Sequence, residues 1–319
     1  MMQYYGVAAI TFLLGLIAPA GAAAKDENGV HPPRELIVSG DFLIPVKIGE
    51  QVLRLRVDPG MPSTRVLNPD VAARLSLKPS KMWGHWDRIG PIIVKSSTAK
   101  IEVDYLPIRR KDRFAWSTYR VIEDANGVIA PSALPYDQVT FSLAAARPGE
   151  TLITLPLQST GLLGWGGNAT SLMVGETEIR VIFRLDREEN VLIAPTGKLI
   201  ADAYGGALFG QIRPFNVRYG IERPVRLMVL AHPLLLGGRA IANPWIRVSD
   251  FGDATRIPDG EAPAADPDEI VVHAENKHKK KKSFQLIALG RSFLAGCSSM
   301  TYDFKQKQIR LSCVPATSL

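Results

Sequence analysis

Cysteine and histidine are scarce in this sequence. Among its 319 residues there are two cysteines and five histidines. The histidines are scattered along the chain, at His31, His85, His232, His273 and His278. Their positions show none of the spacings by which metal ligands are usually arranged in a sequence. The composition therefore predicts no metal site.

Motifs that identify several common enzyme classes are absent as well. The chain contains no glycine-rich phosphate loop, no Walker pattern and no G-x-S-x-G nucleophile elbow. Nucleotide-dependent chemistry and serine hydrolysis therefore find little support in the sequence. We expect the protein to work without a cofactor.

The N-terminus carries a short apolar run. The run is uncharged, occupies residues 6–18, and is followed by a proline and several small residues. This pattern predicts a secretory signal at residues 1–24, with cleavage after Ala22 or Ala24. No Lys or Arg precedes the run, but it is shorter than a bilayer span, which favours cleavage. We expect an exported protein, periplasmic or secreted, with an uncleaved N-terminal anchor as the alternative.

Charged residues are present in ordinary amounts, with positive charge in excess. A composition of 46% hydrophobic and 22% charged residues is typical of a globular chain that buries a sizeable core. The net charge is +7, and a visible part of the excess is the KHKKKK stretch at residues 277–282. This stretch belongs to a charged loop predicted at residues 259–283, whose first part is acidic and contains prolines.

The lysine cluster in this loop has two interpretations. Its members are Lys277, Lys279, Lys280, Lys281 and Lys282. Such a cluster can contact an anionic lipid or cell-wall polymer, or it can be a solvated loop. We favour the solvated loop, because no aromatic residues interleave the lysines. We expect no nucleic-acid partner, because the protein is predicted to be exported.

The two cysteines lie close together near the C-terminus. Between Cys297 and Cys313, the sequence predicts two short strands joined by a polar turn at residues 305–308. Such a hairpin brings the two sulfurs face to face, and export places them in an oxidising compartment. We expect one disulfide, with two buried thiols as the alternative.

The chain contains an internal repeat. Residues 48–70 align without a gap with residues 174–196, at an offset of 126. The alignment matches glycine with glycine at the turn and proline with proline at the end. It also places Arg184 opposite Asp58. Two further pairs of segments recur in the same order, 89–94 with 212–217 and 128–134 with 288–294.

The repeat predicts two copies of one β-rich unit. The first copy spans residues 38–145, the second spans residues 167–314, and residues 146–166 form a linker rich in glycine and proline. Short alternating apolar segments within each copy predict strands, whereas helices are expected mainly at residues 71–77 and 197–205. The predicted fold is therefore mainly β and two-lobed, with few short helices. We also expect the strands at 139–143 and 308–312 to join the sheets that hold Asp58 and Arg184.

Three ordered motifs resemble a known family. A strand pair leads to Asp58-Pro59-Gly60, residues 63–67 read S-T-R-V-L before a short helix, and an apolar-apolar-small segment recurs at residues 128–130 and 288–290. This order resembles the retropepsin-like aspartic peptidases, duplicated in one chain as in the two-lobed pepsin-like enzymes. Each motif is weak alone, and the weight lies in their order.

The resemblance implies a catalytic pair of carboxylates at the lobe interface. In that family each lobe supplies one aspartate, and the two share a proton while activating a water molecule. Asp58 is then the candidate catalytic residue, and Gly60 suits the active-site turn. This sequence departs from the pattern at Arg184, which stands where the partner acid belongs. It also departs at Pro59, which lacks the usual hydroxyl and backbone N–H.

Two functions follow from these departures. The favoured one is a catalytically impaired protein whose cleft binds an extended peptide or protein, with Arg184 forming an ion pair with Asp58 across the lobes. The alternative is an active aspartic endopeptidase in which Asp186, Glu188 or Glu189 supplies the second carboxylate after a loop shift. Asp58 acting only as the cap of its turn is the structural alternative. We expect a monomer, because the second lobe already occupies the place of a partner chain.

Two tryptophans lie where the family has its substrate-covering hairpin. Trp83 and Trp86 are candidates to line a peptide groove, with burial inside the hairpin as the commoner use of such residues. A second D-x-G motif, at residues 250–252, falls outside the repeat position and is interpreted as a turn.

Overall fold

The computed structural model describes residues 34–62, 64–106, 108–160, 167–250, 252, 254–261 and 284–315. The predicted signal at residues 1–24 and the lysine cluster at residues 277–282 lie outside the described residues. Part of the linker predicted at residues 146–166 does so too. Residues Glu35–Leu319 form one unit of the chain, and all that follows concerns this unit.

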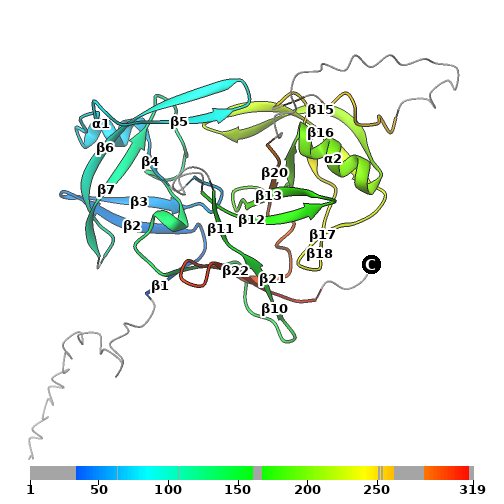
Figure 1. Cartoon of the computed structure of the whole chain (residues 1–319). Helices are drawn as coiled ribbons and strands as arrows, with labels where there is room; N and C mark the ends of the chain where they lie inside the picture. Colours follow the sequence, from blue (N-terminus) through cyan, green and yellow to red (C-terminus); the bar gives the residue numbers. More distant parts are fainter. Residues whose placement is uncertain are drawn as a thin grey trace, which may run out of the picture. The chain divides into compact units, whose positions relative to one another are not determined.

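The prediction of a mainly β, two-lobed fold is confirmed (Figure 1). The first lobe is a seven-stranded sheet in the order β2 (Leu43–Ile48), β3 (Gln51–Val57), β8 (Gly127–Ile129), β4 (Arg65–Leu67), β7 (Arg109–Trp116), β6 (Ile92–Asp104) and β5 (Gly84–Ile89). An additional pairing of β2 with β6 closes six of these strands into a barrel. The short helix α1 (Pro69–Arg74) follows β4, and the 3-10 turn η1 (Pro131–Ala133) follows β8.

The second lobe is an eight-stranded sheet. Its strands run in the order β11 (Gln158–Thr160), β12 (Gly167–Val174), β13 (Thr177–Phe183), β20 (Leu286–Leu289), β14 (Val191–Ile193), β19 (Trp245–Arg247), β16 (Ile221–Leu230) and β15 (Gly206–Arg218). Helix α2 (Ala194–Tyr204) follows β14, and a separate hairpin consists of β17 (Leu234–Leu236) and β18 (Arg239–Ile241). Among the described residues, no helix is both long and apolar enough to cross a bilayer.

A third sheet combines strands from both halves of the chain. Its order is β1 (Glu35–Val38), β9 (Gln138–Ser142), β21 (Cys297–Asp303), β22 (Gln308–Cys313) and β10 (Thr151–Pro156). The expectation that β9 and β22 join the sheets of Asp58 and Arg184 is therefore wrong. Instead, β9 pairs with β1 and β21, and β22 pairs with β21 and β10, so both strands lie inside the third sheet. The shared sheet joins the two halves instead.

Strand pairing is the same in the two lobes. In the first lobe β8 pairs in parallel with β3 and antiparallel with β4, and in the second lobe β20 pairs likewise with β13 and β14. The backbone N–H of Asp58 donates to the carbonyl of Ile129 at 3.0 Å, and that of Arg184 donates to the carbonyl of Leu289 at 2.7 Å. Asp58 and Arg184 therefore occupy equivalent places in the two lobes.

One hydrophobic core runs through both lobes and the shared sheet. Phe141 of β9 packs edge-to-face against Tyr302 of β21, with ring centroids 6.1 Å apart, and against Phe42 of the first lobe at 5.4 Å. These rings belong to the same buried cluster as Phe183 at the end of β13. The turns that carry Asp58 and Arg184 thus start from a rigid interior.

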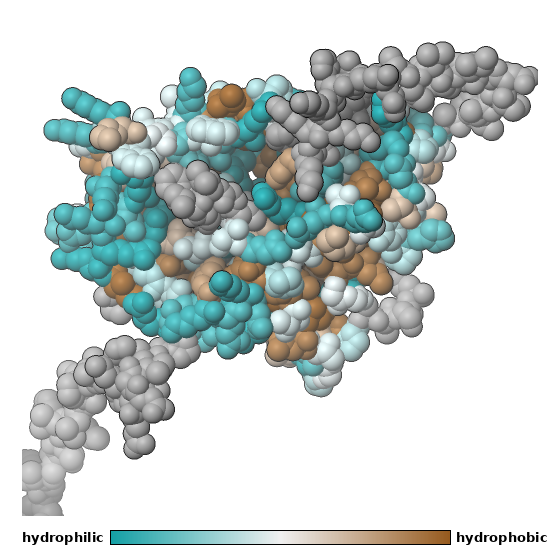
Figure 2. Space-filling view, viewed as in Figure 1, coloured by the Kyte–Doolittle hydropathy of each residue, from teal (hydrophilic) through white to brown (hydrophobic). Residues whose placement is uncertain are grey.

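Apolar side chains also reach the surface near the shared sheet. In the view of Figure 2, most of the first lobe is hydrophilic, whereas hydrophobic residues gather over the part where β10 and β21 lie in Figure 1. Leu152 of β10 is 65% exposed. Single exposed apolar residues of this kind are normal on protein surfaces.

The predicted disulfide between Cys297 and Cys313 is present. The two cysteines are paired neighbours on β21 and β22, which are the last two strands of the chain. The bond therefore closes the C-terminal hairpin that joins the two halves. Its loop is short, with a sequence separation of 16 residues.

Replacing both cysteines, in Cys297→Ser/Cys313→Ser, should lower the free energy of unfolding by about 3 kcal/mol, because the unfolded chain regains the entropy of this loop. Equilibrium urea unfolding of the two proteins measures the difference. Wild type unfolded in the presence of a reductant serves as the control and should give the same loss. An unchanged free energy of unfolding in the double variant would contradict the stabilising role of the bond.

Candidate functional site

Asp58 ends β3 at the boundary between the lobes. It is 9% exposed, and its Oδ1 accepts a hydrogen bond from the N–H of Gly60 at 2.8 Å. Among the described residues this is its one side-chain hydrogen bond, so Asp58 caps its own turn. A Cβ on Gly60 would lie 2.0 Å from Cδ of Arg184, which no side chain tolerates. Glycine is required here because the turn packs directly on the second lobe.

Arg184 ends β13 and is 6% exposed. Its guanidinium binds Asp186 through two hydrogen bonds, from Nε to Oδ1 at 2.8 Å and from Nη2 to Oδ2 at 2.7 Å. Arg184 therefore forms its ion pair with Asp186 of its own lobe. The expected ion pair with Asp58 across the lobes is wrong. Burial alone would lower the pKa of Arg184, but the negative charges of Asp58 and Asp186 raise it overall.

Asp186 is shared by two arginines. Arg187 also donates to it, from Nη2 at 2.7 Å and from Nε at 3.2 Å. The Arg187 guanidinium is fixed further by the carbonyls of Asn216 and Val217, each at 3.1 Å. Burial alone would raise the pKa of Asp186, but the two guanidiniums hold it well below its usual range. We refer to Arg184, Asp186 and Arg187 as the arginine clamp.

The other two candidate acids are also paired with arginines. Glu188 is exposed and bonds Arg291 at 2.7 Å. Glu189 bonds Arg213 at 3.0 Å, and although burial would raise its pKa, this bond lowers it below the usual value. Each of the three acids proposed as a second carboxylate is therefore bound to an arginine.

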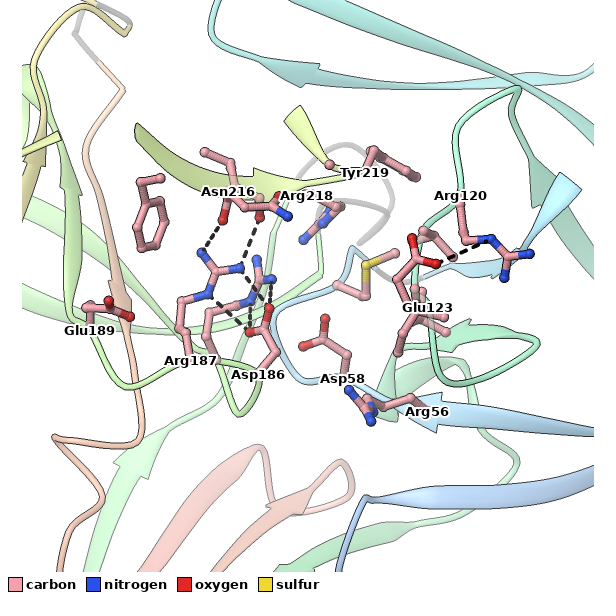
Figure 3. Close-up of a pocket in the computed structure, with 18 of the residues that line it drawn as sticks. Arg56, Asp58, Arg120, Glu123, Asp186, Arg187, Glu189, Asn216, Arg218 and Tyr219 are labelled. Carbon is pink, nitrogen blue, oxygen red and sulfur yellow. Dashed lines mark hydrogen bonds and ion pairs between the residues drawn. The ribbon is translucent and has the colours of Figure 1, made fainter. Parts of the chain in front are cut away.

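A cavity of about 460 Å³ lies between the lobes beside Asp58. Figure 3 shows Asp58 and Asp186, one from each lobe, pointing toward the same space. The charged residues that line the cavity are Arg56, Asp58, Arg120, Glu123, Arg184, Asp186, Arg187, Glu189, Arg213 and Arg218. Six arginines face four acids, so positive charge exceeds negative charge by two. A cavity of this composition suits the binding of an anionic ligand better than it suits two carboxylates that share a proton.

Two hairpins, one from each lobe, meet above this cavity. The first is β5–β6, and its tip at Gly90 rests on the second lobe, since a Cβ there would lie 2.2 Å from Oδ1 of Asp250. Asp250 is 1% exposed and binds Arg223 at 2.7 Å and Nε of Arg247 at 2.6 Å. Asp250 lies in a bend directly after a turn at residues 248–249, in agreement with the interpretation from the sequence, and its buried carboxyl is also where the hairpin docks.

The second hairpin, β15–β16, binds the first through its tip. The hydroxyl of Tyr219 donates to Asp87 of β5 at 2.6 Å, and Nη2 of Arg218 donates to the carbonyl of Gly60 at 2.7 Å. Burial alone would raise the pKa of Asp87, but His85 and Arg218 lower it to about 2. Asp87 is therefore an anion that holds the two hairpins together over the cavity.

Trp83 and Trp86 lie away from this arrangement. Trp83 is 50% exposed and lines a separate first-lobe pocket of about 380 Å³, with Arg113 stacked on its ring at 5.6 Å. Trp86 is 65% exposed. Neither lines the cavity beside Asp58, and neither is buried inside its hairpin. The interpretation that they are buried inside the hairpin is therefore wrong; for Trp86, the side chains of Asp87 and Ile89 fill the buried face of β5 instead. That either tryptophan lines a peptide groove stays a prediction.

Several residues of the site were not recognised in the sequence. Arg187, Arg213 and Arg218 were not singled out, although the latter two lie in or beside the repeated segment 212–217. That repeat was the available signal, since it matched this segment to the tip of the first hairpin. Within the described part of the chain, no group of three or more potential ligands could hold a metal ion.

Two comparisons with known proteins found no match. No protein-family model matches the chain, and no curated protein matches it. The site has therefore to be interpreted from its own chemistry.

Removing the charge of Arg184, in Arg184→Met, should lower the free energy of unfolding by roughly 3 kcal/mol, because Asp186 loses a buried partner. Urea unfolding measures this loss. The matched control is Arg109→Met, which breaks an exposed pair with Glu102 at 3.3 Å and should cost about 0–1 kcal/mol. Equal losses in the two variants would contradict the structural importance of the arginine clamp.

The pKa of Asp87 predicts an acid-dependent loss of stability. A carboxyl that ionises at about 2 in the folded chain, against 3.8 without perturbation, stabilises the fold by about 2 kcal/mol. Since the folded value is the lower one, this stabilisation is complete above about pH 4 and is lost as the pH falls through about 2.

Between about pH 5 and about pH 2, wild type should therefore lose about 2 kcal/mol more stability than Asp87→Asn, as measured by urea unfolding at each pH. The control Asp202→Asn, in an exposed pair with Lys198, should keep the wild-type dependence. Parallel pH profiles for wild type and Asp87→Asn would contradict the assignment.

Proposed function

We propose that this protein binds an extended peptide in the cavity between its lobes and does not cleave it. The architecture suggested by the sequence is that of the two-lobed aspartic peptidases, and the proposal treats the chain as a non-catalytic member of that group. The proposal that the protein does not cleave its ligand rests on one observation. Arg184 occupies in the second lobe the place that Asp58 occupies in the first, and it is bound to Asp186.

The chemistry of peptide hydrolysis explains why this substitution matters. One carboxylate must accept a proton from water while an acid delivers a proton to the departing amine. Asp58 can serve as a base, but a guanidinium with a raised pKa does not deliver a proton. Asp186, the acid nearest to Arg184 in sequence, is held ionised by the clamp. The reaction therefore lacks its acid.

Binding is supported by the shape of the site. A second pocket of about 230 Å³ shares Arg184, Arg187 and Arg218 with the main cavity and continues past Gly60 toward apolar residues of the second lobe. Each covering hairpin also has one strand, β5 or β15, at the edge of its sheet. Edge strands can pair with an extended peptide through backbone hydrogen bonds. Two adjacent pockets with such edges suit a peptide better than they suit a compact small molecule.

The purified protein should cleave no member of a diverse peptide library between about pH 2 and about pH 8, because no second acid is available to Asp58. Mass spectrometry of the library after incubation detects cleavage, and fluorescence polarisation with pools of the same peptides detects binding. Asp58→Asn should leave the absence of cleavage unchanged.

One result would show that the protein is an active peptidase. Pepstatin-sensitive cleavage by wild type that disappears in Asp58→Asn would refute the proposal. It would favour an endopeptidase in which Asp186, Glu188 or Glu189 supplies the second carboxylate. Failure of every library peptide to bind would refute the peptide-binding function itself.

A further inference from the structure

We infer that the peptide recognised in this cavity is acidic, and that Arg218 is the residue that binds its carboxylate. This inference rests on the proposed function and adds the ligand class to it. Its starting point is the surplus of positive charge on the cavity lining, where six arginines face four acids.

Arg218 has the largest unused capacity to donate hydrogen bonds. A guanidinium carries five N–H donors. Among the described residues, Arg218 uses one of them as a hydrogen bond, to the carbonyl of Gly60. Its Nε is buried and has no acceptor among those residues, and its nearest carboxylate, Asp87, lies 3.9 Å away. Because the buried Nε has no accessible surface, the donors that a ligand in the cavity can use are those of the two Nη atoms, of which the described residues use one.

The other arginines of the cavity divide into two groups. Arg184 and Arg187 are occupied by the clamp, and Arg213 is occupied by Glu189 and by the ring of Trp245, 3.9 Å away. The remaining two belong to the first lobe. Arg56 pairs with Asp124 and also has a buried Nε without an acceptor among the described residues.

Arg120 completes the first-lobe group. It is shared between Asp70 at 2.9 Å and Glu123 at 3.7 Å, and its side chain is 39% exposed. Figure 3 shows Arg218 on the second-lobe side of the cavity and Arg56 and Arg120 on the first-lobe side. The available donors therefore surround the space that a ligand would occupy, and Arg218 is the most buried of the three.

Acids in the same cavity determine where a ligand carboxylate can lie. Asp186 and Glu189 of the second lobe are bound by arginines, whereas Asp58 of the first lobe makes no ion pair among the described residues and would repel a second negative charge placed beside it. Arg218 projects from the tip of β15 and faces Gly60, so a carboxylate bound to it lies on the second-lobe side. The position next to Arg218 is therefore the favourable one for an acidic side chain.

The neighbouring pocket indicates a peptide in preference to a small anion. That pocket extends from Arg218 to apolar side chains that include Ile182, Val191 and Phe284. A ligand that places a carboxylate on Arg218 and an adjacent apolar side chain in this pocket would use both surfaces. Glutamate or aspartate next to an apolar residue in an extended peptide has this combination, whereas inorganic phosphate has only the charge.

The test compares three matched peptides by fluorescence polarisation with the full-length protein. The peptides are extended octamers that differ at one central position, which is Glu, Gln or Lys between apolar neighbours. The Glu peptide should bind at least about tenfold tighter than the Gln peptide, because a buried carboxylate–guanidinium bond contributes about 1.5–3 kcal/mol. Added salt should reduce the difference.

Variants assign the effect to Arg218. Arg218→Gln should abolish the preference for Glu, Arg218→Lys should keep part of it, and the control Arg109→Gln on the first lobe should leave it unchanged. Thermal unfolding of each variant shows whether the chain is folded. If Arg218→Gln does not fold, Arg120→Gln provides the second variant and should weaken the preference about threefold to tenfold.

The outcomes separate this inference from the proposed function. Equal binding of the Glu and Gln peptides would overturn the inference and leave peptide binding intact. Displacement of the Glu peptide by free glutamate or inorganic phosphate at similar concentrations would also overturn it, since the site would then recognise the charge alone. Binding of none of the three, together with no binding by the library, would instead refute the proposed function.

Discussion

The bidentate bond between Arg184 and Asp186 is the interaction on which the rest of the site depends. It neutralises a buried guanidinium at the end of β13, and it fixes Asp186 so that Arg187 can share it. Arg184 also packs on the Gly60 turn of the other lobe. Without this bond the lobe interface would contain an uncompensated charge, and an uncompensated buried charge is among the most destabilising features of a protein interior. The same bond holds Asp186, a second-lobe carboxylate of the cavity, in its ionised form and so removes it from any exchange of protons.

The lobes are joined on two sides of the cavity by different kinds of contact. On one side the shared sheet joins strands of both halves through backbone hydrogen bonds and a common apolar core. On the other side the hairpins meet through Asp87, Tyr219 and Arg218, and through Gly90 on Asp250. Polar contacts between hairpin tips open at a smaller cost than a packed sheet does. A ligand would therefore enter from the hairpin side while the shared sheet remains intact.

The sequence predicted the repeat well because that signal is local. The gapless alignment placed Arg184 opposite Asp58, and the structure puts both at the end of equivalent strands with equivalent backbone bonds. The disulfide followed from two cysteines and a hairpin pattern. The third sheet was not predicted, because an alternating apolar pattern predicts a strand and its buried face but does not say with which distant strand it pairs. The partner of Arg184 was also predicted wrongly, because a gapless alignment gives position along the chain and does not give the rotamer of a long side chain.

The exchange of an acid for an arginine changes what the cavity can stabilise. Two carboxylates facing each other repel, and they are useful in a peptidase because that repulsion keeps a proton mobile between them. An arginine in the second position removes the repulsion and provides a fixed positive charge. A fixed charge that contacts a ligand carboxylate, which is already ionised when it binds and does not react, contributes to affinity and not to rate. The charge on the cavity lining and the missing acid therefore have one origin, and both are consistent with a groove that retains its ligand.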